Sequence, residues 1–301
     1  MGRRASLPVA GAVLFLALPI GAYASEPEPY WNSRPLSFWV DALSADDPTL
    51  RQRAAQSVAA LALAQGGDAV AAALPALTGN LAASEPAVRE AAAGALEHMG
   101  SAATGATPAL LRLFTQDDAV AVRRRAGLAL GRIAASSGDV VAEATRIVVQ
   151  DADAGVRASA AILLSSSGAG AAPAAAALEH ALDDPDPHVQ LYSAVALANL
   201  GQTAALTPRV LGLLEHQDAA LRAEAAGLLP VIASDTVQLV APLTQALQDP
   251  DAEVRAAAAG SLGAVGRPAR PALRALFLLL RDPNEVVRER VLLAIHAIRK
   301  R

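Results

Sequence analysis

The chain has 301 residues, of which 53% are hydrophobic and 3% aromatic, and it contains no cysteine. The absence of thiols excludes disulfides, zinc thiolate sites, a cysteine nucleophile and lipid attachment at a cysteine. A formal net charge of −4 argues against nucleic acid or an anionic membrane surface as a partner of the whole molecule. Ala and Leu dominate and β-branched residues are sparse, which indicates an all-α protein.

Residues 1–24 are predicted to be a secretory signal peptide. Arg3 and Arg4 form a basic start, residues 7–20 are apolar, and Ala22-Tyr23-Ala24 fits a signal-peptidase site. The apolar run is short for a membrane span and contains two prolines, so a retained anchor is the weaker alternative. We therefore expect cleavage after Ala24, a periplasmic or secreted protein, and no stable membrane insertion once the signal is removed.

Residues 25–35 are polar and rich in proline, which predicts an extended lead-in without helical periodicity. A short amphipathic helix is expected over residues 36–43. Four aromatic residues fall within ten positions around this boundary, where they would cover the exposed first end of the fold. An aromatic ligand site is the alternative for this cluster, which consists of Tyr30, Trp31, Phe38 and Trp39.

Residues 36–301 repeat one pattern eight times. Each copy carries an apolar residue followed by Arg, and we call that Arg position the reference position of the copy. Successive reference positions are 32 to 38 residues apart, a period typical of stacked helical hairpins. The eight reference residues are Arg51, Arg89, Arg123, Arg157, Gln190, Arg222, Arg255 and Arg288.

A second apolar residue recurs seven positions after each reference residue. Positions −1, +3, +7 and +10 from the reference lie on one stripe of an α-helix, so the second helix of each hairpin is expected to bury that stripe. Small residues at +3 and +4 in most copies allow neighbouring helices to approach closely. The residues expected to be buried at +7 are Val58, Leu96, Leu130, Leu164, Leu197, Leu229, Leu262 and Ile295.

Turn residues mark the same boundaries. An acidic residue four positions before the reference is expected to cap the second helix, as at Asp47, Glu85, Asp153, Asp186, Asp218 and Asp251. Proline is expected near the start of the first helix of most hairpins, at Pro75, Pro108, Pro173, Pro208, Pro242 and Pro271.

The repeated pattern resembles HEAT repeats, in particular the short HEAT-like repeats of phycobilin lyase subunits. The resemblance implies a right-handed α-α superhelix of about eight helix pairs, with first helices on the convex side and second helices on the concave side. It also implies a ladder of Asp and Arg between neighbouring repeats, here Asp251 with Arg255 and Asp153 with Arg157. Gln190 and an extra residue before Arg123 depart from the pattern, so looser joints are expected at those two places.

Binding in such a fold is expected at exposed concave positions of the second helices. Most of these positions hold small residues. His98, Arg125 and Arg132 lie on adjacent repeats and are predicted to form a positive patch, with Tyr192 and Asn199 further along. The alternative is an ordinary solvated helix surface.

The pairs of Glu and His are the candidates for a catalytic metal site, since deoxyhypusine hydroxylase has a HEAT-like fold and presents His-Glu pairs to iron. The pairs in this chain begin at Glu97, Glu179 and Glu215, in reversed order and at positions that do not correspond between repeats. Iron ligands must converge within a few ångströms, and these would not. The acidic segment at residues 183–188 is better explained by helix capping than by calcium, because it lacks the Gly and the distal Glu of a calcium loop.

The sequence thus predicts a non-enzymatic interaction or scaffold module without cofactor or metal, which binds a protein or peptide on its concave face. A HEAT-like enzyme or enzyme subunit, similar to phycobilin lyase or deoxyhypusine hydroxylase, is the alternative. The apolar residues 291–298, followed by a basic tail, offer a further docking or dimerisation surface on the C-terminal helix.

Overall fold

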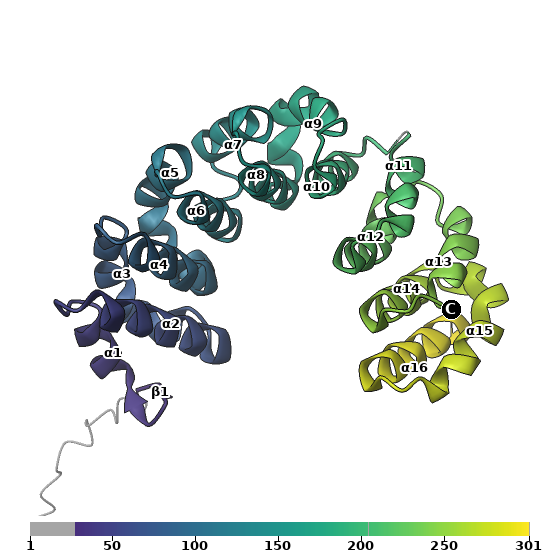
Figure 1. Cartoon of the computed structure of the whole chain (residues 1–301), viewed down its shortest axis with the longest axis horizontal. Coiled ribbons are helices and arrows are strands. Elements are labelled where there is room, and N and C mark those ends of the chain that lie inside the picture. Colours follow the sequence, from purple (N-terminus) through teal and green to yellow (C-terminus); the bar gives the residue numbers. More distant parts are fainter. Residues whose placement is uncertain (1–27, 204, 301) are drawn as a thin grey trace, which may run out of the picture.

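The structure is a computed structural model that describes residues 28–203 and 205–300. Eight helical hairpins are stacked side by side in this part of the chain and form an open arch (Figure 1). The predicted signal peptide and its cleavage site lie outside the described residues.

The second helices of the hairpins line the inner rim of the arch, as expected (Figure 1). Each packs against the second helix of the next hairpin, and these contacts form the main axis of the fold. The inner helices are α2 (Pro48–Gln65), α4 (Pro86–Met99), α6 (Val120–Ile133), α8 (Ala154–Ser166), α10 (Pro187–Asn199), α12 (Ala219–Ile232), α14 (Ala252–Val265) and α16 (Glu285–Lys300).

The first helices form the outer rim and are mostly shorter. They are α1 (Leu36–Ala42), α3 (Leu74–Asn80), α5 (Thr107–Gln116), α7 (Gly138–Gln150), α9 (Ala175–Ala181), α11 (Leu206–Gly212), α13 (Val240–Ala246) and α15 (Leu273–Leu278). Five of them begin after a 3₁₀ segment: η1 (Asp68–Ala73), η2 (Gly100–Ala106), η3 (Gly168–Ala174), η5 (Val237–Leu239) and η6 (Arg267–Ala272). Two more 3₁₀ segments, η4 (Leu213–Glu215) and η7 (Leu279–Arg281), follow α11 and α15.

The prolines of the first helices do not all mark an α-helical start. Pro75 and Pro108 are the second residues of α3 and α5, as expected. Pro173 and Pro271 instead lie inside the 3₁₀ segments η3 and η6. Proline periodicity therefore located the hairpins, but it did not distinguish the two kinds of helix.

The lead-in contains structure that the sequence did not predict. Strands β1 (Tyr30–Trp31) and β2 (Arg34–Pro35) pair antiparallel around Asn32 and Ser33, whose φ values are 50° and 60°. The Trp39 indole donates a hydrogen bond of 3.3 Å from Nε1 to the Trp31 carbonyl. Trp39 is buried while Tyr30 remains exposed, so the aromatic residues cover this end of the solenoid only in part.

One continuous core runs through the hairpins. All eight apolar residues predicted at +7 are buried, which confirms the assignment of the buried stripe. Small residues at +4 allow inner helices to lie close together. A Cβ added to Gly127 would come within 2.7 Å of the Phe114 ring and of Ser159 Oγ on α8.

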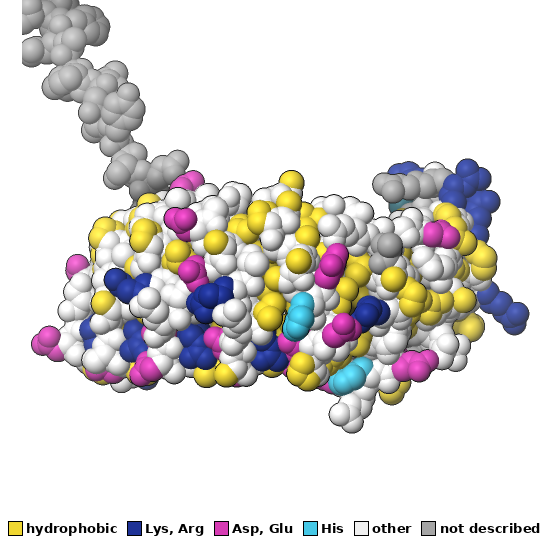
Figure 2. Space-filling model, turned by 90° about the horizontal axis from the view of Figure 1, so that it is seen from above, with side chains coloured by type: hydrophobic (Ala, Val, Ile, Leu, Met, Phe, Trp, Pro, Cys, Tyr) yellow, Lys and Arg dark blue, Asp and Glu magenta, His cyan; other side chains and the backbone are white. Residues whose placement is uncertain are grey.

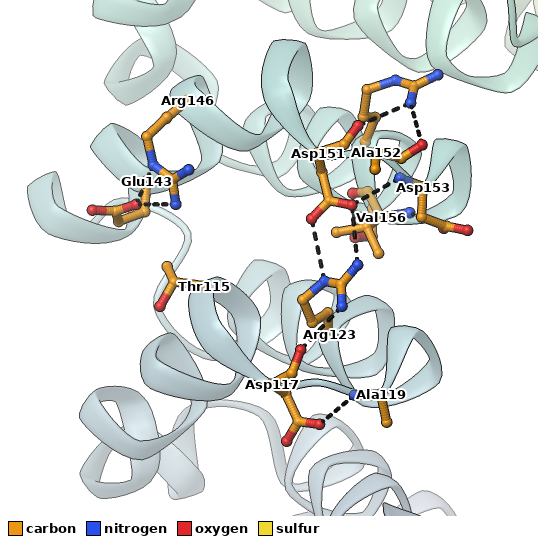
Figure 3. A network of polar contacts seen from close by, with 12 residues as sticks. Thr115, Asp117, Ala119, Arg123, Glu143, Arg146, Asp151, Ala152, Asp153 and Val156 are labelled. Carbon is orange, nitrogen blue, oxygen red and sulfur yellow. Dashed lines mark hydrogen bonds and ion pairs between the residues drawn. The ribbon is translucent and has the colours of Figure 1, made fainter.

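Five reference arginines join consecutive hairpins through one repeated arrangement, which we call a rung. Nε and Nη2 of the Arg donate to the two carboxylate oxygens of an Asp in the turn of the next hairpin, at 2.7 to 3.2 Å. Figure 3 shows one rung, in which Arg123 points from α6 to Asp151. The other four join Arg89 to Asp117, Arg157 to Asp184, Arg222 to Asp249, and Arg255 to Asp282.

The expected partners within the ladder need correction. Asp153 and Asp251 are not rung members; each caps its own inner helix by accepting backbone N–H groups. The rung aspartate lies two residues earlier and also accepts the backbone N–H of the capping residue, as Asp249 does from Asp251 at 2.8 Å. Two carboxylates are needed because one fixes the turn to the previous hairpin and the other satisfies the free N–H groups of the helix start.

Glu85 is a further correction. It occupies the capping position before α4, but its side chain makes no capping hydrogen bond. Its carboxylate accepts from Arg51 Nη2 at 3.0 Å instead. At the first joint, where α2 packs against α4, a single Arg–Glu contact therefore takes the place of a full rung.

The two joints predicted to be loose behave differently. The Arg123 rung is complete, so the extra residue before it does not loosen that joint. Between α10 and α12 no rung forms, because Gln190 reaches only the carbonyl of Asp184, at 2.7 Å. His216 stands two residues before the capping Asp218, where other turns have the rung aspartate. Accordingly, α10 and α12 contact each other less extensively than any other two consecutive inner helices.

Candidate functional site

The concave face is built from inner-helix side chains that point away from the core. Many of these are Ala, Gly or Ser, so the face is shallow and open over long stretches. Two hollows lie on it, one in each half of the arch.

The larger hollow spans α12, α14 and α16 and has a volume of about 640 Å³. Its floor includes Gly227 and Gly260, which occupy the same position, five after the reference, in consecutive repeats. No atom lies within 4 Å of where a Cβ would stand at either glycine. The missing side chains therefore leave the hollow open at this point.

Apolar and charged groups surround this floor. Val231 and Val286 are half-exposed and contribute apolar surface at the hollow. Glu253 and Arg290 also line it, from α14 and α16. The hollow thus combines exposed apolar side chains with charges of both signs, a composition that suits a segment of another protein.

The smaller hollow, of about 260 Å³, contains part of the predicted positive patch. His98 of α4 and Arg125 of α6 line it together, next to Glu90. Arg125 Nη1 also donates to Glu97 at 3.1 Å, which neutralises part of its charge. Arg132 is exposed two turns further along α6 and does not line this hollow.

Tyr192 and Asn199 do not extend that patch, because both connect helices. The Tyr192 hydroxyl donates to Glu224 at 3.0 Å, and Asn199 Nδ2 donates to the Ser165 carbonyl at 2.9 Å. Burial, together with the Glu224 carboxylate, raises the pKa of Tyr192. A phenol in this environment stays protonated at neutral pH and acts as a hydrogen-bond donor that bridges α10 and α12.

The three Glu-His pairs lie on different parts of the solenoid. Glu97 and His98 belong to the inner helix α4, Glu179 and His180 to the outer helix α9, and Glu215 and His216 to the end of the outer layer of the next hairpin. Over residues 28–203 and 205–300, no group of three or more His, Asp or Glu side chains is placed to hold a metal ion.

The acidic segment at residues 183–188 is used within the fold. Asp183 pairs with Arg209 at 2.7 Å, Asp184 accepts the rung from Arg157, and Asp186 caps α10. Capping accounts for part of this segment, as expected, and ion pairs with two other hairpins account for the rest.

None of the helices in the described part of the chain combines the length and apolar character needed to span a membrane. The outer side of the arch carries basic and acidic side chains interspersed with each other (Figure 2). That mixture gives no support to nucleic acid as a ligand of this side.

The larger hollow was missed at the sequence level. Its signal was the recurrence of glycine at the fifth position after the reference, at Gly227 and Gly260. Glycine destabilises the middle of a helix by about 0.5–1 kcal/mol relative to alanine, so its recurrence on one face is informative. The sequence analysis predicted binding in the other half of the arch, because the charged residues of the inner helices are most evident there.

Stacked hairpins, an inner and an outer helical layer and an open concave face define an α-solenoid. The sequence model of the family described as HEAT repeats matches residues 36–131 and 207–296, more than half of the chain. The chain belongs to the HEAT-repeat family. The interval between the two matches, residues 132–206, contains α10 and Gln190 on one side of the joint that lacks a rung, whereas α12 lies in the second match.

The chain is similar to structures of several other proteins. A homology model of the AP-3 complex is 14% identical, matches 87% of this chain and 50% of its own, and has a TM-score of 0.56. An engineered protein is 23% identical over 87% of this chain and 78% of its own, with a TM-score of 0.48. Kap121p is 14% identical over 90% of this chain and 38% of its own, with a TM-score of 0.46. No curated protein sequence matches the chain.

Proposed function

We propose that this protein is an exported, non-enzymatic interaction module that binds an amphipathic helix of a partner protein on its concave face. The main support is the hollow across α12, α14 and α16, where two helix-interior glycines leave space beside exposed apolar side chains. A helix can lay its apolar side chains into such a groove.

The charges at the hollow favour a partner helix that carries both signs. Arg290 would meet an acidic residue of the partner, and Glu253 a basic one. His98 and Arg125, which line the smaller hollow in the other half of the arch, would bind a further acidic residue of the same partner. The proposal that the protein is exported depends on the predicted signal peptide. The similarity to phycobilin lyase repeats does not indicate which partner is bound.

The binding face can be tested by photo-crosslinking in the cell. A photoreactive amino acid at Ala257, inside the hollow, is expected to capture one dominant protein through a peptide with helical apolar spacing. The matched control is Ala241 on the outer helix α13 of the same hairpin, which is exposed on the opposite side. Equal capture from both positions, or a tetrapyrrole or metal bound to the purified protein, would contradict the proposal.

A substitution that fills the hollow separates binding from folding. Gly260→Leu has room for its Cβ and replaces a weak helix former, so the fold should remain intact. We expect it to weaken binding of the captured peptide at least about tenfold, as measured by calorimetry. Gly79→Leu on the outer helix α3 also points into open space and should leave the affinity unchanged.

Export is tested separately. The protein should be recovered from a periplasmic or secreted fraction with Ser25 as its first residue, as determined by N-terminal sequencing. A cytoplasmic protein that retains its first residues would overturn this part of the proposal and leave the binding face untouched.

A further inference from the structure

The last inner helix, α16, carries a stripe of residues that no later hairpin covers in the described part of the chain. The positions are identified by comparison with the earlier inner helices. A Cβ on Gly263 of α14 would come within 3.0 Å of the Ala294 backbone of α16, and one on Gly131 of α6 within 3.3 Å of Leu163 on α8. Position +8 from the reference therefore faces the next inner helix, and Gly127 shows the same for position +4.

In the last repeat, the residues at these two positions are larger than those of α14, the inner helix before it. At +4, the first seven repeats have a buried Ala or Gly, whereas the eighth has Leu292, which is 58% exposed. At +8, where α14 has Gly263, α16 has His296. A further inner helix packed on this face at the usual spacing would collide with Leu292, because every interior joint has Ala or Gly at +4. Position +8 is less uniform, since it also holds Glu97 on α4 and Pro230 on α12. The exposed face of α16 therefore differs from the interior joints at Leu292.

Leu292 lies in the middle of a stripe with a charge gradient. Glu285, Glu289, Leu292, His296 and Arg299 follow one another at spacings of four, three, four and three residues, so they lie on one face of α16. Within this stripe the acidic residues precede the leucine and the basic residues follow it. Arg288, at the edge of the same face, donates instead to the Asp282 and Pro283 carbonyls of its own turn. Leu292, His296 and Arg299 also line a shallow hollow of about 440 Å³ on this face.

This order makes the stripe complementary to itself when reversed. If two copies of α16 lie antiparallel with their Leu292 residues in contact, Glu289 of each meets His296 of the other and Glu285 meets Arg299. The helix dipole alone favours acids at the start and bases at the end of any helix. It does not account for an exposed leucine at a position where the other repeats have small buried residues.

We propose that two copies of this chain pair through the end face of α16, antiparallel and around a twofold axis that passes close to Leu292. Such an interface is isologous, which is the commonest arrangement in homodimers. It joins the two solenoids at their C-terminal ends, apart from the concave hollow, and it does not depend on the proposed function.

The first experiment measures self-association of the full chain by sedimentation equilibrium. We expect a monomer–dimer equilibrium with a Kd on the order of 10 μM, since a single helix pair gives a small interface. Leu292→Glu should abolish the dimer without loss of helicity, because the side chain is exposed. A wild-type chain that remains monomeric up to about 1 mM would overturn the proposal.

Charge exchange then tests the antiparallel arrangement. Glu285→Arg alone and Arg299→Glu alone should each weaken the dimer about tenfold at low salt, because each creates two like-charge contacts. The double variant Glu285→Arg/Arg299→Glu restores opposite charges only in an antiparallel pair and should recover the wild-type Kd. In a parallel pair each of these residues would face its own copy, so neither single variant would change a like-charge contact. Single variants with the wild-type affinity, or a double variant that stays as weak as the single variants, would overturn the antiparallel arrangement.

The absence of native cysteine allows a third test. A residue on a twofold axis faces its own copy, so Leu292→Cys should form a disulfide-linked dimer under mild oxidation. Leu293→Cys is the matched control, since this neighbouring residue is 64% exposed but points about 100° away around the helix. Equal crosslinking of both variants would show random collision and would count against the interface.

Discussion

At the scale of single residues, the apolar positions at +7 carry the fold. Leu197 of α10 is 2% exposed and belongs to the continuous core of the solenoid. The repeat pattern alone was enough to place it there, because only one face of an inner helix is apolar in every copy.

Truncation of this leucine should therefore be costly. Leu197→Ala is expected to lower the free energy of unfolding by about 2–5 kcal/mol, because it removes buried surface and leaves a cavity. Urea denaturation measures the effect, and Leu63→Ala is the control, since Leu63 on α2 is 73% exposed and should change stability by less than about 0.5 kcal/mol. Similar losses for the two variants would contradict the burial of Leu197.

At the scale of elements, the joint between α10 and α12 differs from its neighbours. It lacks a rung, and the bond from Tyr192 to Glu224 spans it on the concave side. The connection that follows α10 also contains Ala205 with a φ of 61°, a conformation that is strained for a residue with a Cβ. We infer that the solenoid bends at this joint more readily than elsewhere.

The missing rung can be restored. Gln190→Arg together with His216→Asp places the usual pair at the usual positions and leaves the net charge unchanged. The double variant should be more stable than the sum of the single variants predicts, by about 1.5–3 kcal/mol, as hydrogen bonds between charged groups are. Additive effects in a double-mutant cycle would show that this joint cannot accommodate a rung.

The same double variant should also narrow the motion across the joint. One pair of spin labels, on cysteines introduced at Ser166 of α8 and Ala264 of α14, spans three joints, including the one between α10 and α12. A control pair, at Ala60 of α2 and Ser166, also spans three joints but not that one. In double electron–electron resonance, the first pair should give the broader distribution of label-to-label distances. Restoring the rung should narrow that distribution. The second pair reports on any general flexibility.

At the scale of the whole molecule, the rungs make stability depend on pH. Hydrogen bonds from Arg222 and Arg255 hold the pKa of Asp249 and of Asp282 below the usual value, although desolvation acts in the opposite direction. Groups with a lowered folded pKa contribute their full stability above the unfolded pKa of about 4. That contribution is lost as the pH falls through the folded values.

We therefore expect the urea midpoint to be constant near neutral pH and to fall steeply below about pH 4. Asp282→Asn should be less stable than wild type at pH 7, because it weakens one rung, and the difference should shrink as the pH falls. A difference that persists unchanged at about pH 2.5 would show that ionisation of Asp282 does not stabilise the fold.

The sequence by itself determined the hairpins, the buried stripe and the capping turns, because these depend on residues close together in the chain and are repeated eight times. It also located one weak joint, through Gln190, and it missed the β-hairpin, which depends on two residues with positive φ. Only the tertiary structure decided that each arginine binds the aspartate of the next turn and not the capping aspartate two residues later. It also showed that consecutive glycines open a hollow on the concave face, because contacts between repeats depend on the spacing and rotation of whole helices.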